Sequence, residues 1–524
     1  MNKFLDAIKT ENNFTYTENG AVALKSTMDD VLDAFSTLGT FVKNCDGNED
    51  KILRTFYKAF AEDKALAMRL LFYLRDVRGG QGCRQLFRII MRSLAELHPA
   101  FVVNNLENFL FYGRGDDLVC LLDTSVESAM FDYVNDVLAE DLASVRNGGS
   151  CSLLAKWLPS ENASSVATVI DAKRFIKGLG LTPKAYRKRL SELRKAINIV
   201  ETLMSQNKWD EIEFDKLPSR ASMIYADAFE KHVKDNYYDY LMKLATGDSK
   251  VNAGALYPYD IIHKIREKAN ASTWCFTPTE RIKRKDVLLL DAMWKALPNY
   301  FEEAGKEETG LCVIDTSGSM LGTPIEVAVS LGIYCADKAK GPFKNHFITF
   351  SANPELQEIK GDTIVEKYHN LEHAHWGMNT DLVAVFKLIL DTAIRNNLTN
   401  EEIPDKLYII SDMQFDQATS SRIKSTLISR IRKEFEDAGY TFPAIVYWNV
   451  DTRDCGMFQE TKSGMNCCMV SGYSSSLFKS VILGTEYEEV IVNGKKVTKT
   501  KLDPMTVMLN TLNNERYDRV WGGE

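Results

Sequence analysis

The chain has 524 residues, of which 45% are hydrophobic and 26% charged, and its formal net charge is −8. This composition is typical of a folded globular protein and excludes a largely disordered chain. The length suits two or three domains. The sequence has no apolar run long enough for a signal peptide or a membrane-spanning helix. Ten cysteines occur without a C-x-x-C pair, which favours reduced thiols, so we expect a cytoplasmic protein without membrane association.

The first part of the chain has the apolar spacing of amphipathic helices. From about residue 28 to 270, apolar side chains recur at intervals of three and four. Short polar breaks, such as GRGDD at 113–117 and KLPSR at 216–220, separate successive helical pairs. This pattern predicts an α-helical repeat (HEAT-like) module over residues 1–305, which ends in a helix over 288–305.

The pattern of apolar residues changes after Gly310, where short apolar segments alternate with helical stretches. This alternation predicts a mostly parallel sheet with helices on both faces, in an α/β domain that spans residues 306–524. The expected helices run roughly over 325–340, 380–397 and 418–438. The expected strands are 311–314, 346–350, 406–410, 443–448 and 467–470.

Two segments are basic although the whole chain is acidic. Residues 151–200 contain ten Lys or Arg against three Asp or Glu, and residues 75–92 contain five Arg against one Asp. Thr182 and Pro183 predict the start of a helix with one apolar side and one basic side. Such surfaces could bind a polyanion, and the alternative is a solvated surface held by structural ion pairs. The candidate RNA-binding residues are Arg75, Arg78, Arg84, Arg88, Arg114, Lys156, Lys184, Arg187, Lys188, Arg194, Lys195 and Arg220.

Side chains with oxygen donors follow two of the predicted strands. Asp315, Ser317 and Ser319 form a D-x-S-x-S motif after strand 311–314, and Asp412 follows strand 406–410, while Thr380 opens a predicted helix. In open α/β sheets, ligands bind beyond the carboxyl ends of the strands. Hard oxygen donors suit a divalent cation, with Mg²⁺ expected and Mn²⁺ or Ca²⁺ as alternatives. The alternative to a metal site is a purely structural turn, in which the Asp and Ser residues cap a helix.

These five side chains would leave one coordination position that a carboxylate of a protein partner could fill. A hydrolase would need a general base or a second metal close by, and neither is clear in these loops. We therefore expect no enzymatic activity, and keep a metal-dependent nuclease as an alternative. His369, His373 and His375 could instead bind a transition metal, but we expect them to shape the loop that carries Thr380.

The order of these loops resembles the metal-ion-dependent adhesion site of von Willebrand factor A domains. Asp315, Ser317 and Ser319 match its first loop, Thr380 its second and Asp412 its third. The resemblance implies the von Willebrand factor A fold, a Rossmann-like sheet, and a cation that docks an outside ligand.

The helical half has strings of its own that are similar to the TROVE module of the Ro ribonucleoprotein family. They are RDVRGGQGCRQLFRIIMR at 75–92, NLENFLFYGRGDDL at 105–118, LLAKWLPS at 153–160 and KLPSRA at 216–221. In that family, paired helices are joined to a von Willebrand factor A domain. The resemblance implies binding of small noncoding RNA and of the single-stranded ends of misfolded RNA. A protein-interaction scaffold independent of RNA, which binds an acidic partner or a chaperone-like ATPase through the metal, remains an alternative.

Overall fold

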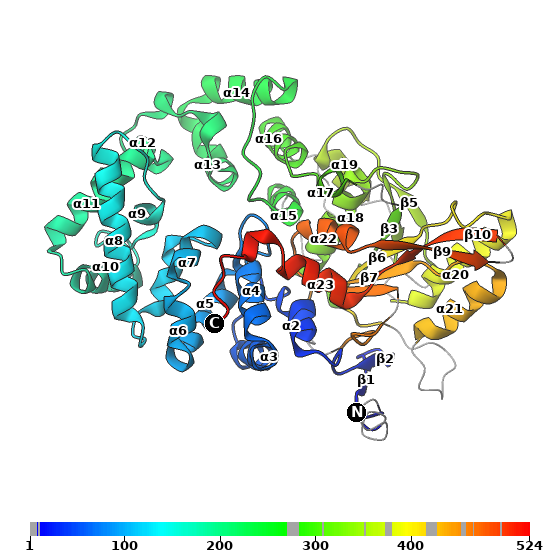
Figure 1. Ribbon diagram of the computed structural model, residues 1–524. Helices are drawn as coiled ribbons and strands as arrows, with labels where there is room; N and C mark the ends of the chain where they lie inside the picture. The colour runs from blue at the N-terminus through cyan, green and yellow to red at the C-terminus, as the bar shows by residue number, and fades with distance from the viewer. Residues whose placement is uncertain are drawn as a thin grey trace. The chain divides into compact units, whose positions relative to one another are not determined.

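The computed structural model divides into two compact units (Figure 1). We call residues 45–240 and 514–524 the helical unit, and residues 1–44 and 241–513 the α/β unit. The described residues are 8, 11–43, 45–269, 282–305, 309–350, 353–371, 380–415, 427–451, 457–464, 466–492 and 495–523. Within them, no helix is long and apolar enough to cross a bilayer.

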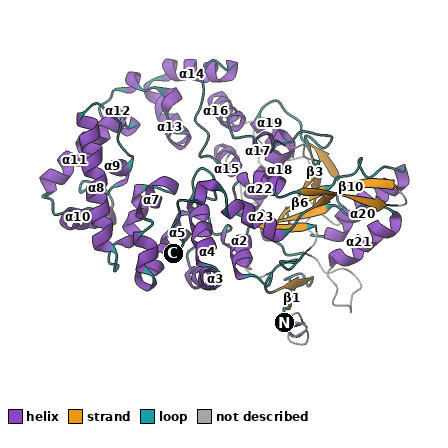
Figure 2. Cartoon of the chain, viewed as in Figure 1, coloured by secondary structure: helices purple, strands orange, loops and turns teal. Residues whose placement is uncertain are grey.

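Helices and turns make up the helical unit, and no named strand occurs in residues 45–240, all of which are described (Figure 2). Neighbours in sequence pack together: α3 contacts α4 and α5, and α8 contacts α10 and α11. The helix-rich character predicted for this part of the chain is therefore confirmed. The main helices are α3 (Glu49–Glu62), α4 (Lys64–Arg75), α5 (Arg84–Leu97), α6 (Pro99–Val103), α7 (Leu106–Tyr112), α8 (Glu127–Arg146), α9 (Leu154–Trp157), α10 (Val166–Gly178), α11 (Pro183–Ile197), α12 (Val200–Ser205) and α13 (Ser219–His232).

Helix α11 forms where the sequence predicts it. The hydroxyl of Thr182 accepts a hydrogen bond from the backbone N–H of Ala185 at 3.2 Å, and Pro183 occupies the first turn, where its missing N–H costs nothing. Tyr186, Leu190 and Leu193 are buried. The helix is thus held by its apolar side, and Lys184, Lys188 and Lys195 remain exposed.

The last residues of the chain pack in the helical unit (Figure 1, red). The short helix η6 (Glu515–Tyr517) contacts α4. Tyr517 stacks on Tyr112 with ring centroids 5.5 Å apart, and the Tyr112 hydroxyl donates to the backbone carbonyl of Arg516 at 2.5 Å. This tail lies outside the helical module expected over 1–305, because its packing depends on contacts some 400 residues apart in sequence.

A six-stranded sheet in the order β5-β4-β3-β6-β7-β8 forms the core of the α/β unit. All pairs are parallel except β4 with β5, so the mostly parallel sheet is confirmed, as are the five predicted strands. The sequence missed β5, a short and largely exposed edge strand, and the separate β9–β10 hairpin. The strands are β3 (Gly310–Ile314), β4 (His346–Thr349), β5 (Leu356–Glu358), β6 (Lys406–Ser411), β7 (Ala444–Asn449), β8 (Cys467–Ser471), β9 (Glu486–Val492) and β10 (Lys495–Lys501).

Helices cover the sheet. Some of them come from residues 241–305, which precede the first strand of the sheet in sequence. Helix α18 (Thr323–Lys338) packs on β3, β4 and β6, and α15 (Pro258–Lys268) packs on α18. The compact units therefore differ from the predicted boundary between residues 305 and 306. The remaining helices are α14 (Lys234–Thr246), which spans the boundary at residue 240, α16 (Arg284–Lys295), α17 (Tyr300–Ala304), α19 (Ile364–Leu371), α20 (Leu382–Asn396), α21 (Leu427–Ala438), α22 (Ser476–Leu483) and α23 (Pro504–Leu512).

Two predicted helices have different bounds in the structure. The helix expected over 288–305 is two helices, α16 and α17, which separate around Pro298 because proline has no N–H for the helix ladder. The helix expected over 418–438 is observed from Leu427, and residues 416–426 lie outside the described part of the chain.

The first residues of the chain also belong to the α/β unit. They form β1 (Phe14–Tyr16), β2 (Val22–Leu24) and α2 (Asp30–Leu38), and α2 packs on β8. Its C-cap, Gly39, donates its N–H to the Ser471 hydroxyl at 3.1 Å. A Cβ atom at Gly39 would lie 2.3 Å from the Ser471 carbonyl oxygen, so only glycine fits this contact.

Candidate functional sites

The candidate metal loops lie where the strand order of the sheet reverses. Strand β3 has β4 on one side and β6 on the other, and all three run parallel. The carboxyl ends of β3 and β6 therefore flank the crevice in which open α/β sheets bind ligands. Asp315 follows β3 directly and Asp412 follows β6 directly, so both carboxylates lie at this crevice.

The first loop is held by hydrogen bonds to Asp315. This side chain is fully buried and accepts from the Ser317 N–H at 2.9 Å and from the Ser411 hydroxyl at 2.5 Å. The hydroxyl oxygens of Ser317 and Ser319 lie 3.0 Å apart. The D-x-S-x-S spacing thus folds into one tight loop, as the sequence predicts.

The second and third loops are joined through the backbone of Gln414. The Thr380 hydroxyl, 1% exposed, donates to the Gln414 carbonyl at 2.9 Å. The Gln414 N–H donates to Asp412 at 3.1 Å. Between them, Met413 adopts a left-handed φ of 64°, an unfavourable conformation for this residue that is common at functional loops.

Burial and a neighbouring charge both act on the Asp315 carboxylate. Burial, and then the negative charge of Asp412, raise the pKa of Asp315 to about 7. A divalent cation would offset the cost of both buried charges, and the nearby hydroxyls are the hard donors it prefers. Among the described residues, no cluster of three or more His, Cys, Asp or Glu could hold a metal, so a cation at these loops would need hydroxyl oxygens as further ligands.

The sequence missed parts of this candidate site. Ser411 and Gln414 form hydrogen bonds with the candidate ligand residues, and their only sequence signal is that they lie within two residues of Asp412. Two histidines of the alternative transition-metal site, His373 and His375, lie outside the described residues. His369 lies on α19.

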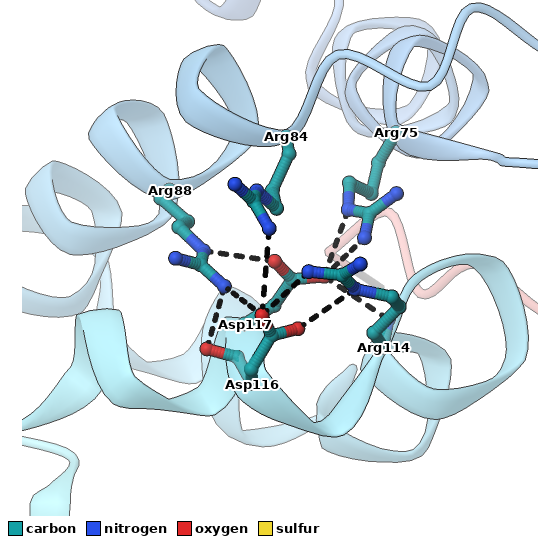
Figure 3. A network of polar contacts seen from close by, with 6 residues as sticks. All are labelled: Arg75, Arg84, Arg88, Arg114, Asp116 and Asp117. Atoms are coloured by element: carbon teal, nitrogen blue, oxygen red, sulfur yellow. Dashed lines mark hydrogen bonds and ion pairs between the residues drawn. The ribbon is translucent and has the colours of Figure 1, made fainter. Parts of the chain in front are cut away.

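Four of the arginines proposed to bind RNA surround two aspartates of the GRGDD string (Figure 3). Asp117, fully buried, accepts from Arg75 at 2.6 Å and from Arg88 at 2.8 Å. Asp116 pairs with Arg114 at 2.6 Å, and also with Arg88 and Arg84 at 3.1 and 3.5 Å. These arginines form a structural ion-pair network, the alternative considered from the sequence.

The first glycine of this string, Gly113, is required for steric reasons. A Cβ atom at Gly113 would lie 2.5 Å from the carboxylate of Asp117 and 3.0 Å from the Nε atom of Arg75. Any side chain at this position would therefore push the buried ion pair apart.

Arg194, another candidate, is also used within the fold. Its guanidinium donates to the backbone carbonyls of Ala155 and Leu158 and to the Ser160 hydroxyl, each at 2.8 Å. Tyr112 and Tyr186 are at most 1% exposed and belong to the core, so neither ring is available to stack on a base. Arg114 lies over the ring of Trp157 at 4.1 Å.

The other basic candidates are at or near the surface of the helical unit. Lys184, Lys188 and Lys195 are exposed on α11, whereas Arg187 pairs with Glu161 at 2.8 Å. Because positions four and eleven apart share a helical face, the three lysines line one side of α11. The remaining candidates are Arg78 and Arg220, which are exposed, and Lys156, which is half-buried over the ring of Trp157.

The fold and the candidate site together define a protein with one helical unit and one α/β unit. The α/β unit carries side chains with oxygen donors where the strand order of its sheet reverses. The sequence matches two described families: Domain of unknown function (DUF2828) over residues 17–138 and 177–306, and Domain of unknown function (DUF7788) over residues 309–512. It is 30% identical to uncharacterized protein L728 of Acanthamoeba polyphaga mimivirus, over 97% of this chain and 90% of that protein. The chain belongs to the same family as L728.

A solved structure is also similar over most of the chain. It is the Ro (RSR) protein of Deinococcus radiodurans, at 12% identity and a TM-score of 0.38, over 92% of this chain and 99% of that chain. At this level of likeness the comparison supports no argument about function.

Proposed function

We propose that this protein is an RNA-binding protein of the Ro-like type. In this proposal the helical, HEAT-like repeat unit holds small noncoding RNA or single-stranded RNA ends. The α/β unit, of the von Willebrand factor A type, binds Mg²⁺ or a similar cation, through which it docks an acidic group of a protein partner. The proposal includes no enzymatic activity and a cytoplasmic location.

The RNA-binding part rests on the exposed basic side of α11. Lys184, Lys188 and Lys195 are exposed there, and the nearby acids are engaged by other groups: Glu192 with Arg146 at 2.8 Å, and Glu161 with Arg187. The lysines therefore project positive charge that phosphates can neutralise. Binding through such contacts depends strongly on salt and little on base sequence.

Reversing two of these charges should weaken RNA binding. We expect Lys184→Glu with Lys188→Glu to lower the affinity for a single-stranded RNA oligonucleotide by at least about tenfold at low salt. The slope of log affinity against log salt should fall by about 1.4, since each phosphate contact on a single strand contributes about 0.7. Fluorescence anisotropy over a salt series measures both quantities.

A matched control is available in the same unit. Arg54 and Lys58 are exposed on α3 with the same spacing of four residues, so Arg54→Glu with Lys58→Glu changes the net charge equally. If only total charge mattered, both double variants would lose the same affinity, and the assignment of the α11 surface would be refuted.

The metal part rests on the buried carboxylates at the switch point. Asp315, Ser317, Ser319, Thr380 and Asp412 would hold the ion, which would supply a positive charge to an outside carboxylate. The loops themselves would exclude bulk water from Asp315, since that side chain is fully buried.

Two other functions make different predictions. A scaffold independent of RNA would show no RNA binding at low salt, yet would still bind a divalent cation. A metal-dependent nuclease would cleave labelled RNA in Mg²⁺ and lose this activity in Asp315→Asn. Cleavage of that kind would contradict the absence of enzymatic activity in our proposal.

A further inference from the structure

The N-terminal β1–β2 hairpin ends in a tightly closed turn. The Thr17 N–H donates a hydrogen bond to the Ala21 carbonyl at 2.8 Å, and the Ala21 N–H donates one to the Thr17 hydroxyl at 2.9 Å. Gly20 has a φ of 84°, which glycine adopts without strain. The turn is therefore a well-defined element of the α/β unit and not a loose end.

The hairpin is also fixed to the α/β unit at its second strand. Leu24 exchanges two backbone hydrogen bonds with Phe458, at 2.7 and 2.8 Å. Further along, the Lys462 N–H donates to the Thr27 carbonyl at 2.7 Å. These contacts hold the turn in place from one side.

On its other side, the turn binds the loop that follows β6. The Thr17 hydroxyl donates to the buried Phe415 carbonyl at 2.8 Å, and the Glu18 N–H donates to the side-chain oxygen of Gln414 at 2.8 Å. Asn19 donates its amide to the Gln414 carbonyl at 2.9 Å and contacts the Thr380 hydroxyl at 3.4 Å.

Asn19 thus contacts the atoms that join two of the candidate metal loops. The Gln414 carbonyl receives hydrogen bonds from both Thr380 and Asn19, and the Gln414 N–H binds Asp412. Partners that orient metal ligands typically change metal affinity by about 10- to 100-fold when removed. The orientation of Thr380 therefore depends on a residue 361 positions earlier in the chain.

We propose that the turn Thr17–Gly20 is a fourth loop of the metal site and that Asn19 is a positioning residue for Thr380. This inference rests on the proposed cation binding. Because coupling between two equilibria is reciprocal, a bound cation should also make the N-terminal hairpin more ordered.

The affinity for Mn²⁺, measured by titration of the full chain, tests this inference. We expect Asn19→Ala to weaken Mn²⁺ binding by about tenfold or more. Thr17→Val, which removes the donor to Phe415, should weaken it in the same direction. Asn12→Ala is the matched control, because Asn12 is exposed and precedes β1 at the open end of the hairpin, and it should stay within about twofold of the unmodified protein.

Hydrogen exchange provides a second measurement that an unrelated loss of stability would not reproduce. In the unmodified protein, Mn²⁺ should slow exchange of the amides of Ala21 and Leu24, and Asn19→Ala should abolish this effect at matched metal occupancy. Equal affinities of Asn19→Ala and Asn12→Ala, with unchanged protection, would overturn the inference and leave the metal site intact. A lack of Mn²⁺ binding by the unmodified protein would instead overturn the proposed site, and the inference with it.

Discussion

Replacing Asp315 with asparagine is expected to lower Mn²⁺ affinity by more than about 100-fold, beyond the range typical of outer-shell partners. Asparagine has the same shape, and its oxygen can still accept from the Ser317 N–H, so the loop should keep its fold. The charge that balances a cation is lost. Isothermal titration of Mn²⁺ into the full chain measures the change.

The same substitution should alter stability when metal is removed. The pKa of Asp315 rises from 3.8 to about 7 on folding, so between these values the native state binds more protons than the unfolded state. Stability in EDTA should therefore fall as pH rises through this window, and stay lower above it. In Asp315→Asn, stability should depend less on pH across this window. Calorimetry measures this as the midpoint of the unfolding transition of the α/β unit, which is identified as the transition that Mn²⁺ shifts.

Asp391 offers a control in the same unit, because it is exposed on α20. Asp391→Asn should leave both Mn²⁺ affinity and the pH dependence unchanged. An Asp315→Asn protein that still bound Mn²⁺ like the control would show that the ion binds elsewhere.

Replacing Asp117 with alanine is expected to lower the free energy of unfolding of the helical unit by about 3 to 5 kcal/mol, because it leaves the charge of a buried arginine unpaired. Arg75 is 1% exposed, and its guanidinium lies 2.6 Å from Asp117. The loss should appear as faster hydrogen exchange in α4, α5 and the η1 segment (Gly115–Leu121), around the network.

Asp116→Ala is the matched control for this prediction. The Asp116 side chain is 24% exposed, and water can solvate the arginines that it leaves. Its loss should cost about 1 kcal/mol or less. Similar exchange rates in the two variants would mean that the buried pair with Arg75 does not stabilise this unit.

The network also shows why charge runs are poor predictors of binding. Arg75, Arg84 and Arg88 look like a basic surface in sequence, because their partners lie 28 to 42 residues later. Helical spacing places arginines on a common face, but it does not reveal which acids meet that face. The packing of η1 against α5, and of α5 against α4, brings Asp116 and Asp117 to them.

The positions of the candidate metal loops are easier to predict, because their candidate ligands are marked by local sequence features. Asp315 and Asp412 directly follow apolar strands, and parallel strands bring their carboxyl ends to one edge of a sheet. The predicted strands and the D-x-S-x-S motif were enough to place them together. Gln414, which joins the second and third loops through its backbone, has no such mark in the sequence.

The sequence alone determined the helix-rich and α/β parts of the chain and predicted the candidate ligands of the metal site, since periodicity and strand ends are local properties. The tertiary structure decided which basic residues are neutralised and which remain on the surface of α11. It also decided that the N-terminal hairpin contacts the metal loops and that the C-terminal tail packs in the helical unit. These are contacts between segments some 360 to 440 residues apart, which form only when both partners have folded.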